Sequence, residues 1–243
     1  NPCCEIILRP YQFCNLSEVI CRAEDTVATL KEKIRLATIL GTFQSTLTDF
    51  GYLRKRWKDT TEEERLLGVS LTGIMDCPAV YDAKPETLQE LRNMAVKTNK
   101  KLAEKLGIKQ SAAVTCVKPS GTVSQLVDAA SGIHARHNPF YVRTVRGDNK
   151  DPLTMFLKDK GVPAEPDFTA PDSVTVFSFP MKSPEGAVCR YDMSAIEQLE
   201  LWLKIADNYC EHKPSVTISV KEHEWLEVGS WCWEHFDSLS GIS

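Results

Sequence analysis

The sequence predicts an α/β protein with a largely parallel sheet, because short apolar segments alternate with longer amphipathic ones. Residues 26–49 carry apolar side chains at helical spacing behind Thr26, a good N-cap residue, and predict a long helix. Residues 85–106 repeat that pattern with Pro85 in the first turn. Two runs rich in small and β-branched residues, 68–76 and 111–117, predict buried strands.

The remaining elements follow the same alternation. Residues 1–20 contain Pro2 and Pro10 and lack helical periodicity, so they predict an extended segment or loop. The other expected strands are 140–146, 173–180 and 214–220, and the other expected helices are 61–68, 124–130, 193–211 and 222–239. In folds of this kind the active site lies at the carboxyl ends of the strands, where 68–76 and 111–117 both end.

Composition limits the function classes. The chain has 243 residues, enough for one large domain or two small ones, and with 42% hydrophobic and 26% charged residues it can bury a core. Its net charge of −4 argues against direct nucleic-acid binding. No apolar run approaches the roughly 18–20 residues that a membrane span needs, so we expect no membrane association.

The cysteines point to a reducing compartment. There are nine, an odd number spread along the chain without an export signal, which does not resemble a secreted disulfide framework. We therefore expect a cytoplasmic protein. Only Cys3 and Cys4 are close in sequence, so no metal site is predicted, and most of the other cysteines are expected in the core.

The stretch KPSGTVS, residues 118–124, has the composition of an anion site. It joins a predicted strand to a predicted helix through a turn with hydroxyl groups and one glycine. Backbone N–H groups at such a turn point at a bound phosphate, and Gly121 allows close approach. A capped helix start without a ligand explains the same residues, and both interpretations remain open at this point.

The stretch NPCCEI places a thiol two residues from a carboxylate. In an extended segment Cys3 and Glu5 project to the same side. An ionised carboxylate disfavours a thiolate beside it, and no lysine or histidine flanks the motif to activate one. The pair therefore suits hydrogen-atom chemistry, which needs S–H, although buried core cysteines would give the same pattern.

Both stretches resemble the ribonucleotide reductases, whose active-site motif usually reads Asn-Pro-Cys-Gly-Glu. The resemblance continues through LATILGTFQSTLTDFGYLRKRW, EERLLGVSLTGIMD, KPSGTVSQLVDAASGIHAR and the final thirty residues, and is strongest to the monomeric, adenosylcobalamin-dependent class. It implies that residues 1–243 form part of one domain, the second half of a ten-stranded α/β barrel with a central finger loop, truncated at both ends.

The resemblance also implies residue roles. Cys3 would carry a thiyl radical, Glu5 would be the base on the ribose 3′-hydroxyl, Asn1 would bind the ribose hydroxyls, and Cys14 would be one of two redox cysteines. The substrate phosphates would bind the turn formed by Pro119, Ser120, Gly121, Thr122, Val123 and Ser124. The implied cofactor is adenosylcobalamin. The implied partners are a ribonucleoside triphosphate substrate, a thioredoxin-like reductant and the missing N-terminal half of the enzyme, without which we expect no activity.

The sequence departs from the family at Cys4, where glycine is usual. A side chain there can crowd the loop, and Cys4 becomes a rival to Cys3 as the radical site, although motif position favours Cys3. Two alternatives remain: a reductase of another class, with a different radical source, or an inactive nucleotide-binding fragment.

Overall fold

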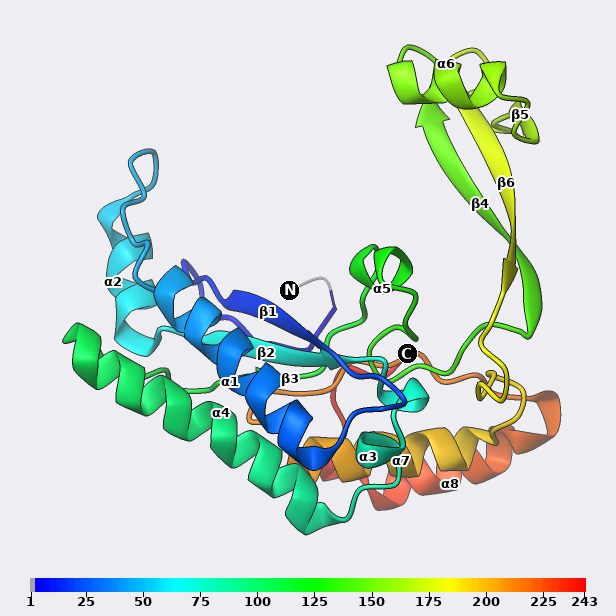
Figure 1. The fold of residues 1–243 in the computed structure, drawn as a ribbon. Coiled ribbons are helices and arrows are strands. Elements are labelled where there is room, and N and C mark those ends of the chain that lie inside the picture. The colour runs from blue at the N-terminus through cyan, green and yellow to red at the C-terminus, as the bar shows by residue number, and fades with distance from the viewer. Residues whose placement is uncertain (1–2) are drawn as a thin grey trace. The chain divides into compact units, whose positions relative to one another are not determined.

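The computed structural model describes residues 3–243, so the predicted role of Asn1 lies outside the described residues. The described residues divide into two compact units. One combines residues 3–135 with 190–243, and the other is 136–189. The α/β class is confirmed, since helices alternate with strands through the larger unit (Figure 1).

The larger unit is built on a parallel sheet of three strands in the order β1-β2-β3. These strands are β1 (Asn15–Ile20), β2 (Leu67–Thr72) and β3 (Thr115–Cys116). Asn15 pairs with Leu67 at one end of the β1–β2 ladder and Ile20 with Thr72 at the other. Every residue of the central strand β2 is buried, as expected of a parallel strand covered on both faces. The prediction of a parallel sheet is confirmed for this unit.

Two long helices pack together beside this sheet (Figure 1). Helix α1 (Val27–Gln44) begins after Thr26, whose side chain accepts from Thr29 N–H in a capping box. Helix α4 (Pro85–Leu106) begins with proline and ends at Gly107, which has φ +65°. Between the helices, buried Asn99 donates to the Thr42 hydroxyl over 3.0 Å.

A third helix anchors the other parts of this unit. Helix α7 (Ala195–Asn208) buries Trp202 completely, and its indole donates to Pro214 O over 2.8 Å. Just after the helix, the buried Tyr209 hydroxyl donates to Val69 O of β2 over 3.0 Å. The remaining helices are α2 (Lys55–Glu64), α3 (Pro78–Tyr81), α5 (Val123–Leu126) and α8 (Trp225–Glu234), with 3₁₀ turns at Ile74–Asp76, Glu222–Glu224 and Phe236–Ser238.

Three strand predictions need correction. The strand expected over 68–76 ends at Thr72, because Gly73 adopts φ +76° and starts a 3₁₀ turn. The strand expected over 111–117 contracts to Thr115–Cys116. Residues 214–220 make only single bridges, Val117 to Pro214 and Val216 to Ile242, and do not form the strand that their alternation predicted.

The smaller unit is an antiparallel sheet, which the sequence analysis did not anticipate. Its strands are β4 (Phe140–Asp148), β6 (Val174–Lys182) and β5 (Ala164–Pro166), in the order β4-β6-β5, and α6 (Pro152–Asp159) lies between β4 and β5 in the chain. Asp167 accepts from Arg146 Nε over 2.7 Å and from the Thr169 hydroxyl over 2.6 Å. None of the helices in residues 3–243 has both the length and the apolarity needed to cross a membrane.

Candidate active site

The candidate site lies where β2 and β3 end. Lys118 follows β3 by two residues, and its backbone N–H donates to the Ser70 hydroxyl of β2 over 2.9 Å. Both backbone groups of Val117 are hydrogen-bonded. Its N–H donates to Lys213 O, and its carbonyl accepts from Ser215 N–H. The start of the KPSGTVS turn is therefore fixed to the central strand.

The Lys118 side chain brings the two predicted stretches together. Its ammonium nitrogen lies 3.2 Å from Cys3 Sγ and 3.1 Å from Glu5 Oε1. Burial opposes the charge on this amine, but the hydrogen bonds to Cys3 and Glu5 outweigh it and raise the pKa of Lys118. One cation thus contacts both the thiol and the carboxylate of NPCCEI.

This contact supplies the Cys3 thiol with a cation that the sequence around the motif does not contain. No lysine or histidine flanks the motif in sequence, but Lys118, 115 residues further on, donates to the sulfur. Glu5 is buried, with 3% of its surface exposed, and its Oε1 is taken by Lys118. Its Oε2 has no hydrogen-bond partner among the described residues. A buried carboxylate oxygen without a donor costs about 1–3 kcal/mol, so this oxygen is placed to receive a donor from a ligand.

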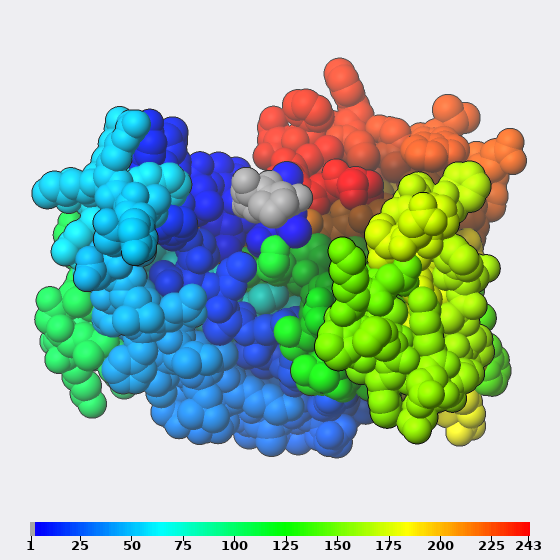
Figure 2. Space-filling view, turned by 90° about the horizontal axis from the view of Figure 1, so that it is seen from above, coloured from blue at the N-terminus to red at the C-terminus, as the bar shows by residue number. Residues whose placement is uncertain are grey.

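Cys4 occupies a backbone conformation that suits glycine. Its φ is +56°, in the left-handed region, and its side chain is exposed. The next residue is held firmly, because Glu5 O accepts from Lys213 N–H over 3.0 Å. The end of the chain also passes close by: a Cβ on Gly241 would lie 3.3 Å from Cys4 O. Figure 2 shows the first described residues, in blue, beside the last residues, in red.

Cys14 lies under the motif in an apolar setting. It packs against a small cluster of buried Ile6, Leu66 and Cys116. Burial, with a smaller contribution from the Glu5 charge, raises the pKa of the Cys14 thiol to about 12. All nine cysteines are free thiols, so Cys14 has no disulfide partner in this chain. With its pKa raised, the Cys14 thiol is protonated near neutral pH and partly buried.

The predicted phosphate turn combines used and unused hydrogen-bonding groups. The buried Ser120 hydroxyl accepts from Ser124 N–H, and the Ser124 hydroxyl donates to Ser120 O over 2.6 Å, so both hydroxyls stabilise the turn itself. By contrast, the N–H groups of Gly121, Thr122 and Val123 donate to no other group among residues 3–243. These three residues are exposed. The groups open to an anion are therefore backbone N–H groups rather than the buried serine hydroxyls.

A second segment, 130–132, packs against this turn and is hydrogen-bonded to it. Ser120 N–H donates to the Ser131 hydroxyl over 2.8 Å, and Ser131 Oγ in turn donates to Ser120 O. Gly132 has φ +56°, and a Cβ at this position would lie 2.7 Å from Lys118 O. Only glycine fits so close to the Lys118 backbone.

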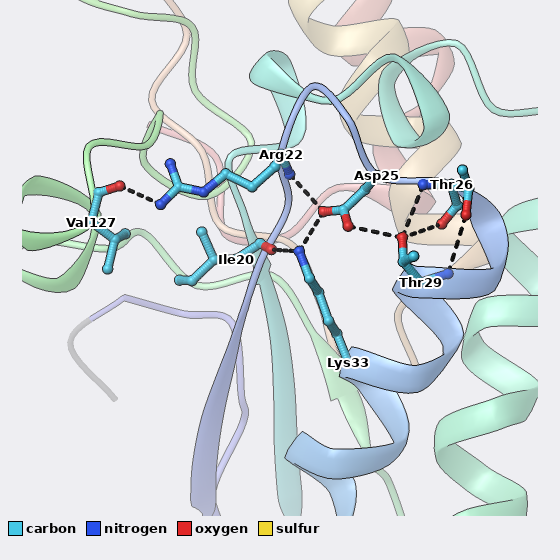
Figure 3. A network of polar contacts seen from close by, with 7 residues as sticks. All are labelled: Ile20, Arg22, Asp25, Thr26, Thr29, Lys33 and Val127. Atoms are coloured by element: carbon cyan, nitrogen blue, oxygen red, sulfur yellow. Dashed lines mark hydrogen bonds and ion pairs between the residues drawn. The ribbon is translucent and has the colours of Figure 1, made fainter.

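Another polar network connects the end of α5, the helix that follows the turn, to the segment just after β1 (Figure 3). The Arg22 guanidinium, just after β1, donates to Val127 O and to Asp128 O at the end of α5. Buried Asp25 accepts from Arg22 N–H over 2.8 Å and from Lys33 Nζ over 2.5 Å. The Thr29 hydroxyl completes the set by donating to Asp25 Oδ1 over 2.9 Å. The turn is thus fixed to β1, to β2 and to 130–132.

Polar residues beside the turn have structural partners. His134 bonds Ser131 O through Nδ1 over 2.9 Å, and its Nε2 accepts from Thr217 N–H over 3.0 Å. Asp76 accepts from Ala130 N–H over 2.7 Å. Trp231 is buried and its indole N–H donates to Glu200, whereas Trp225 and Trp233 are exposed.

The fold of the chain is that of the ribonucleotide reductases. A solved B12-dependent, class II ribonucleotide reductase matches 97% of this chain and 37% of its own chain, with a TM-score of 0.78 and 23% identity. The class Id ribonucleotide reductase alpha subunit of Actinobacillus ureae matches 99% of this chain and 51% of its own, with a TM-score of 0.60 and 15% identity.

Sequence similarity identifies the nearer group. The adenosylcobalamin-dependent ribonucleoside-triphosphate reductase of Euglena gracilis is 28% identical over 250 residues, spanning all of this chain and 33% of that protein. The enzyme of the same name from Lactobacillus acidophilus is 30% identical over 211 residues, 75% of this chain and 28% of that protein. No family model matches the chain. The chain is a homologue of the adenosylcobalamin-dependent ribonucleoside-triphosphate reductases, and it spans about a third of their length.

Proposed function

We propose that this chain is the part of an adenosylcobalamin-dependent ribonucleoside-triphosphate reductase that carries the reacting thiol, the base and the phosphate turn. The observation that carries the proposal is the contact of Lys118, the first residue of the turn, with both Cys3 and Glu5. This contact supports the proposal because chemistry on a phosphorylated sugar requires a thiol, a carboxylate and a phosphate-binding turn close together, and Lys118 begins the turn proposed for that role.

In this proposal each group has one task. Cys3, as a thiyl radical, abstracts the 3′ hydrogen of the ribose, while Glu5 Oε2, which has no partner among residues 3–243, takes the proton of the 3′-hydroxyl. The backbone N–H groups of Gly121, Thr122 and Val123 bind substrate phosphate, held in place by the buried Ser120 and Ser124 hydroxyls. The exposure and backbone strain of Cys4, together with the Lys118 contact to Cys3, favour Cys3 over Cys4 as the radical site.

Adenosylcobalamin, when bound, supplies a carbon-centred radical by homolysis of its cobalt–carbon bond. The residues present fit that chemistry at the Cys3 thiol, which is only partly buried and so can be reached by a hydrogen-abstracting group. Cys14 is a reductant held as a thiol, and its redox partner is expected in the N-terminal half of the whole enzyme, with a thioredoxin-like protein restoring the pair. The three parallel strands would then be part of the ten-stranded barrel, with the segment before β1 as its finger loop.

Nucleotide reduction by the whole protein tests the proposal. Formation of dCTP from CTP is measured with adenosylcobalamin and dithiothreitol for wild type, Cys3→Ser and Cys4→Ser. We expect turnover that requires the cobalamin, is abolished by Cys3→Ser and survives Cys4→Ser. Loss of turnover only in Cys4→Ser would move the radical to the neighbouring thiol. Turnover without cobalamin would assign the chain to another reductase class, and reduction of CTP by residues 1–243 alone would contradict the need for an N-terminal half.

A further inference from the structure

We propose that Lys118 is a positioning residue that holds Cys3 and Glu5 as one unit through a single shared ammonium. For its catalytic meaning this inference rests on the proposed function, but the geometry stands independently of it. The ammonium lies 3.2 Å from the sulfur and 3.1 Å from one carboxylate oxygen, so neither group can move far without losing a charge-assisted hydrogen bond.

The Lys118 backbone is fixed well enough for this task. Its N–H is bonded to Ser70 of the fully buried strand β2, and its carbonyl lies so close to Gly132 that a Cβ there would collide with it. The flexible lysine stem therefore starts from a fixed point. Its side chain is 31% exposed, whereas that of Glu5 is 3% exposed, so the ammonium offsets a carboxylate that is removed from water.

The shared ammonium determines which atoms remain available. Because an ammonium only donates, Cys3 Sγ accepts from Lys118, and the thiol hydrogen points elsewhere. Lys118 also occupies Glu5 Oε1, which leaves Oε2 as the acceptor without a partner among residues 3–243. The Cys3 S–H group and Glu5 Oε2 are then the two groups available to react with one ligand. Because Lys118 bonds both residues, it fixes the distance between these two groups.

The two charges act on the thiol in opposite directions. The Lys118 ammonium stabilises negative charge that develops on Cys3 Sγ during reaction with an electrophile, and the Glu5 carboxylate opposes it. Removing only the ammonium should therefore make Cys3 less reactive toward an electrophile, and removing only the carboxylate should make it more reactive. If Lys118 had only a packing role, the two substitutions would not change Cys3 reactivity in opposite directions.

Alkylation of Cys3 by iodoacetamide between pH 6 and 9 tests this in the 243-residue chain, with each cysteine followed by peptide mass spectrometry. A Cys4→Gly background removes the adjacent cysteine, and fragment ions of the tryptic peptide 1–22, which trypsin leaves uncut at Arg9–Pro10, distinguish Cys3 from Cys14 and Cys21. We expect Lys118→Met to slow Cys3 alkylation at pH 7 by at least about fivefold and Glu5→Gln to speed it by at least about threefold. Lys118→Arg, which keeps the charge, should restore most of the rate.

Lys213→Met is the matched control. Lys213 contacts Glu5 through its backbone N–H, which the substitution keeps, so the variant removes a nearby positive charge without removing that hydrogen bond. It should change the Cys3 rate by less than about twofold. Rates for Lys118→Met and Glu5→Gln both within twofold of wild type would overturn the proposal. Glu5→Gln also serves as an independent test if Lys118→Met does not fold, because it leaves the lysine intact.

Nucleotide reduction by the whole protein separates this inference from the proposed function. If wild type reduces CTP, Lys118→Met should lower kcat at least about tenfold while KM for CTP changes less than about threefold, because phosphate binding does not use this side chain. A chain without reductase activity but with Lys118-dependent alkylation would retain the inference and refute the function. If the wild type is active but Lys118→Met has the same kcat and the same Cys3 alkylation rate as wild type, the proposed function is retained and the role of Lys118 is refuted.

Discussion

Replacing Gly132 by alanine should destabilise the fold by much more than the same change at another glycine with a similar backbone. Gly132 has φ +56°, and an added Cβ would lie 2.7 Å from Lys118 O, a backbone atom that cannot rotate away. Gly107, at the end of α4, has φ +65° but nothing within 4 Å of an added Cβ. Both substitutions put a side chain on a left-handed backbone, but only the Cβ added at Gly132 collides with another atom.

The expected magnitudes follow from these two terms. A side chain in the left-handed region costs about 1–2 kcal/mol, and the reduced freedom of the unfolded chain returns about 0.4–1 kcal/mol, so Gly107→Ala should cost between about 0 and 1.6 kcal/mol. Overpacking against Lys118 O adds about 1–3 kcal/mol. Gly132→Ala should therefore cost about 1–5 kcal/mol in total, about 1–3 kcal/mol more than Gly107→Ala.

Urea unfolding of the 243-residue chain, followed by circular dichroism, measures both values. The slope of free energy against urea must be the same in each variant for the midpoints to be compared. A cost for Gly132→Ala within about 0.5 kcal/mol of that for Gly107→Ala would refute the reasoning, because it would mean that the Lys118 backbone moves freely.

Two further predictions concern titratable groups. Burial tends to raise the pKa of the Asp25 carboxyl, but bonds from Lys33, Arg22 N–H and Thr29 outweigh it and lower the pKa, so this stabilisation is present above the unfolded-state value near 4 and is lost as the pH falls below it. Asp25→Asn should destabilise the chain at pH 7 and flatten the decline in its unfolding midpoint between pH 5 and 3; an unchanged acid profile would contradict the assignment. The partly buried Cys14 thiol, with its pKa raised to about 12, should be alkylated by iodoacetamide at pH 8 at least about 100-fold more slowly than exposed Cys4, and comparable rates by peptide mass spectrometry would refute the raised pKa.

The elements whose ends depend on local chemistry were predictable from sequence. Helix α4 spans residues 85–106 as predicted, because proline at its first position and Gly107 beyond its last are signals carried by single residues. Helix α1 begins after Thr26 as predicted but stops at Gln44, short of the expected residue 49. The Ser45 and Thr46 hydroxyls bond back to the carbonyls of Thr42 and Phe43, and these bonds compete with continuation of the helix.

The features that depend on distant neighbours were not predictable. Residues 214–220 alternate like a strand, but their partners are Val117 on one side and Gly241 on the other, so pairing stays limited to single bridges. Lys118 was read only as the beginning of a turn. Its contact with Glu5 spans 113 residues, and no periodicity or spacing within either segment encodes that contact.

Much of the frame around the candidate site is made by main-chain atoms. Lys213 N–H holds Glu5 O, Gly73 N–H holds Ala130 O over 2.8 Å, and Ser215 N–H holds Val117 O. Bonds of this kind do not depend on which side chain a residue carries. Lineages that share this frame are therefore free to exchange most surrounding residues over evolutionary time. Substitutions should be rejected mainly at two kinds of position. At Gly73 and Gly132 a Cβ would collide with the backbone oxygens of Cys21 and Lys118. At Lys118 and Glu5 the charge of the side chain is required.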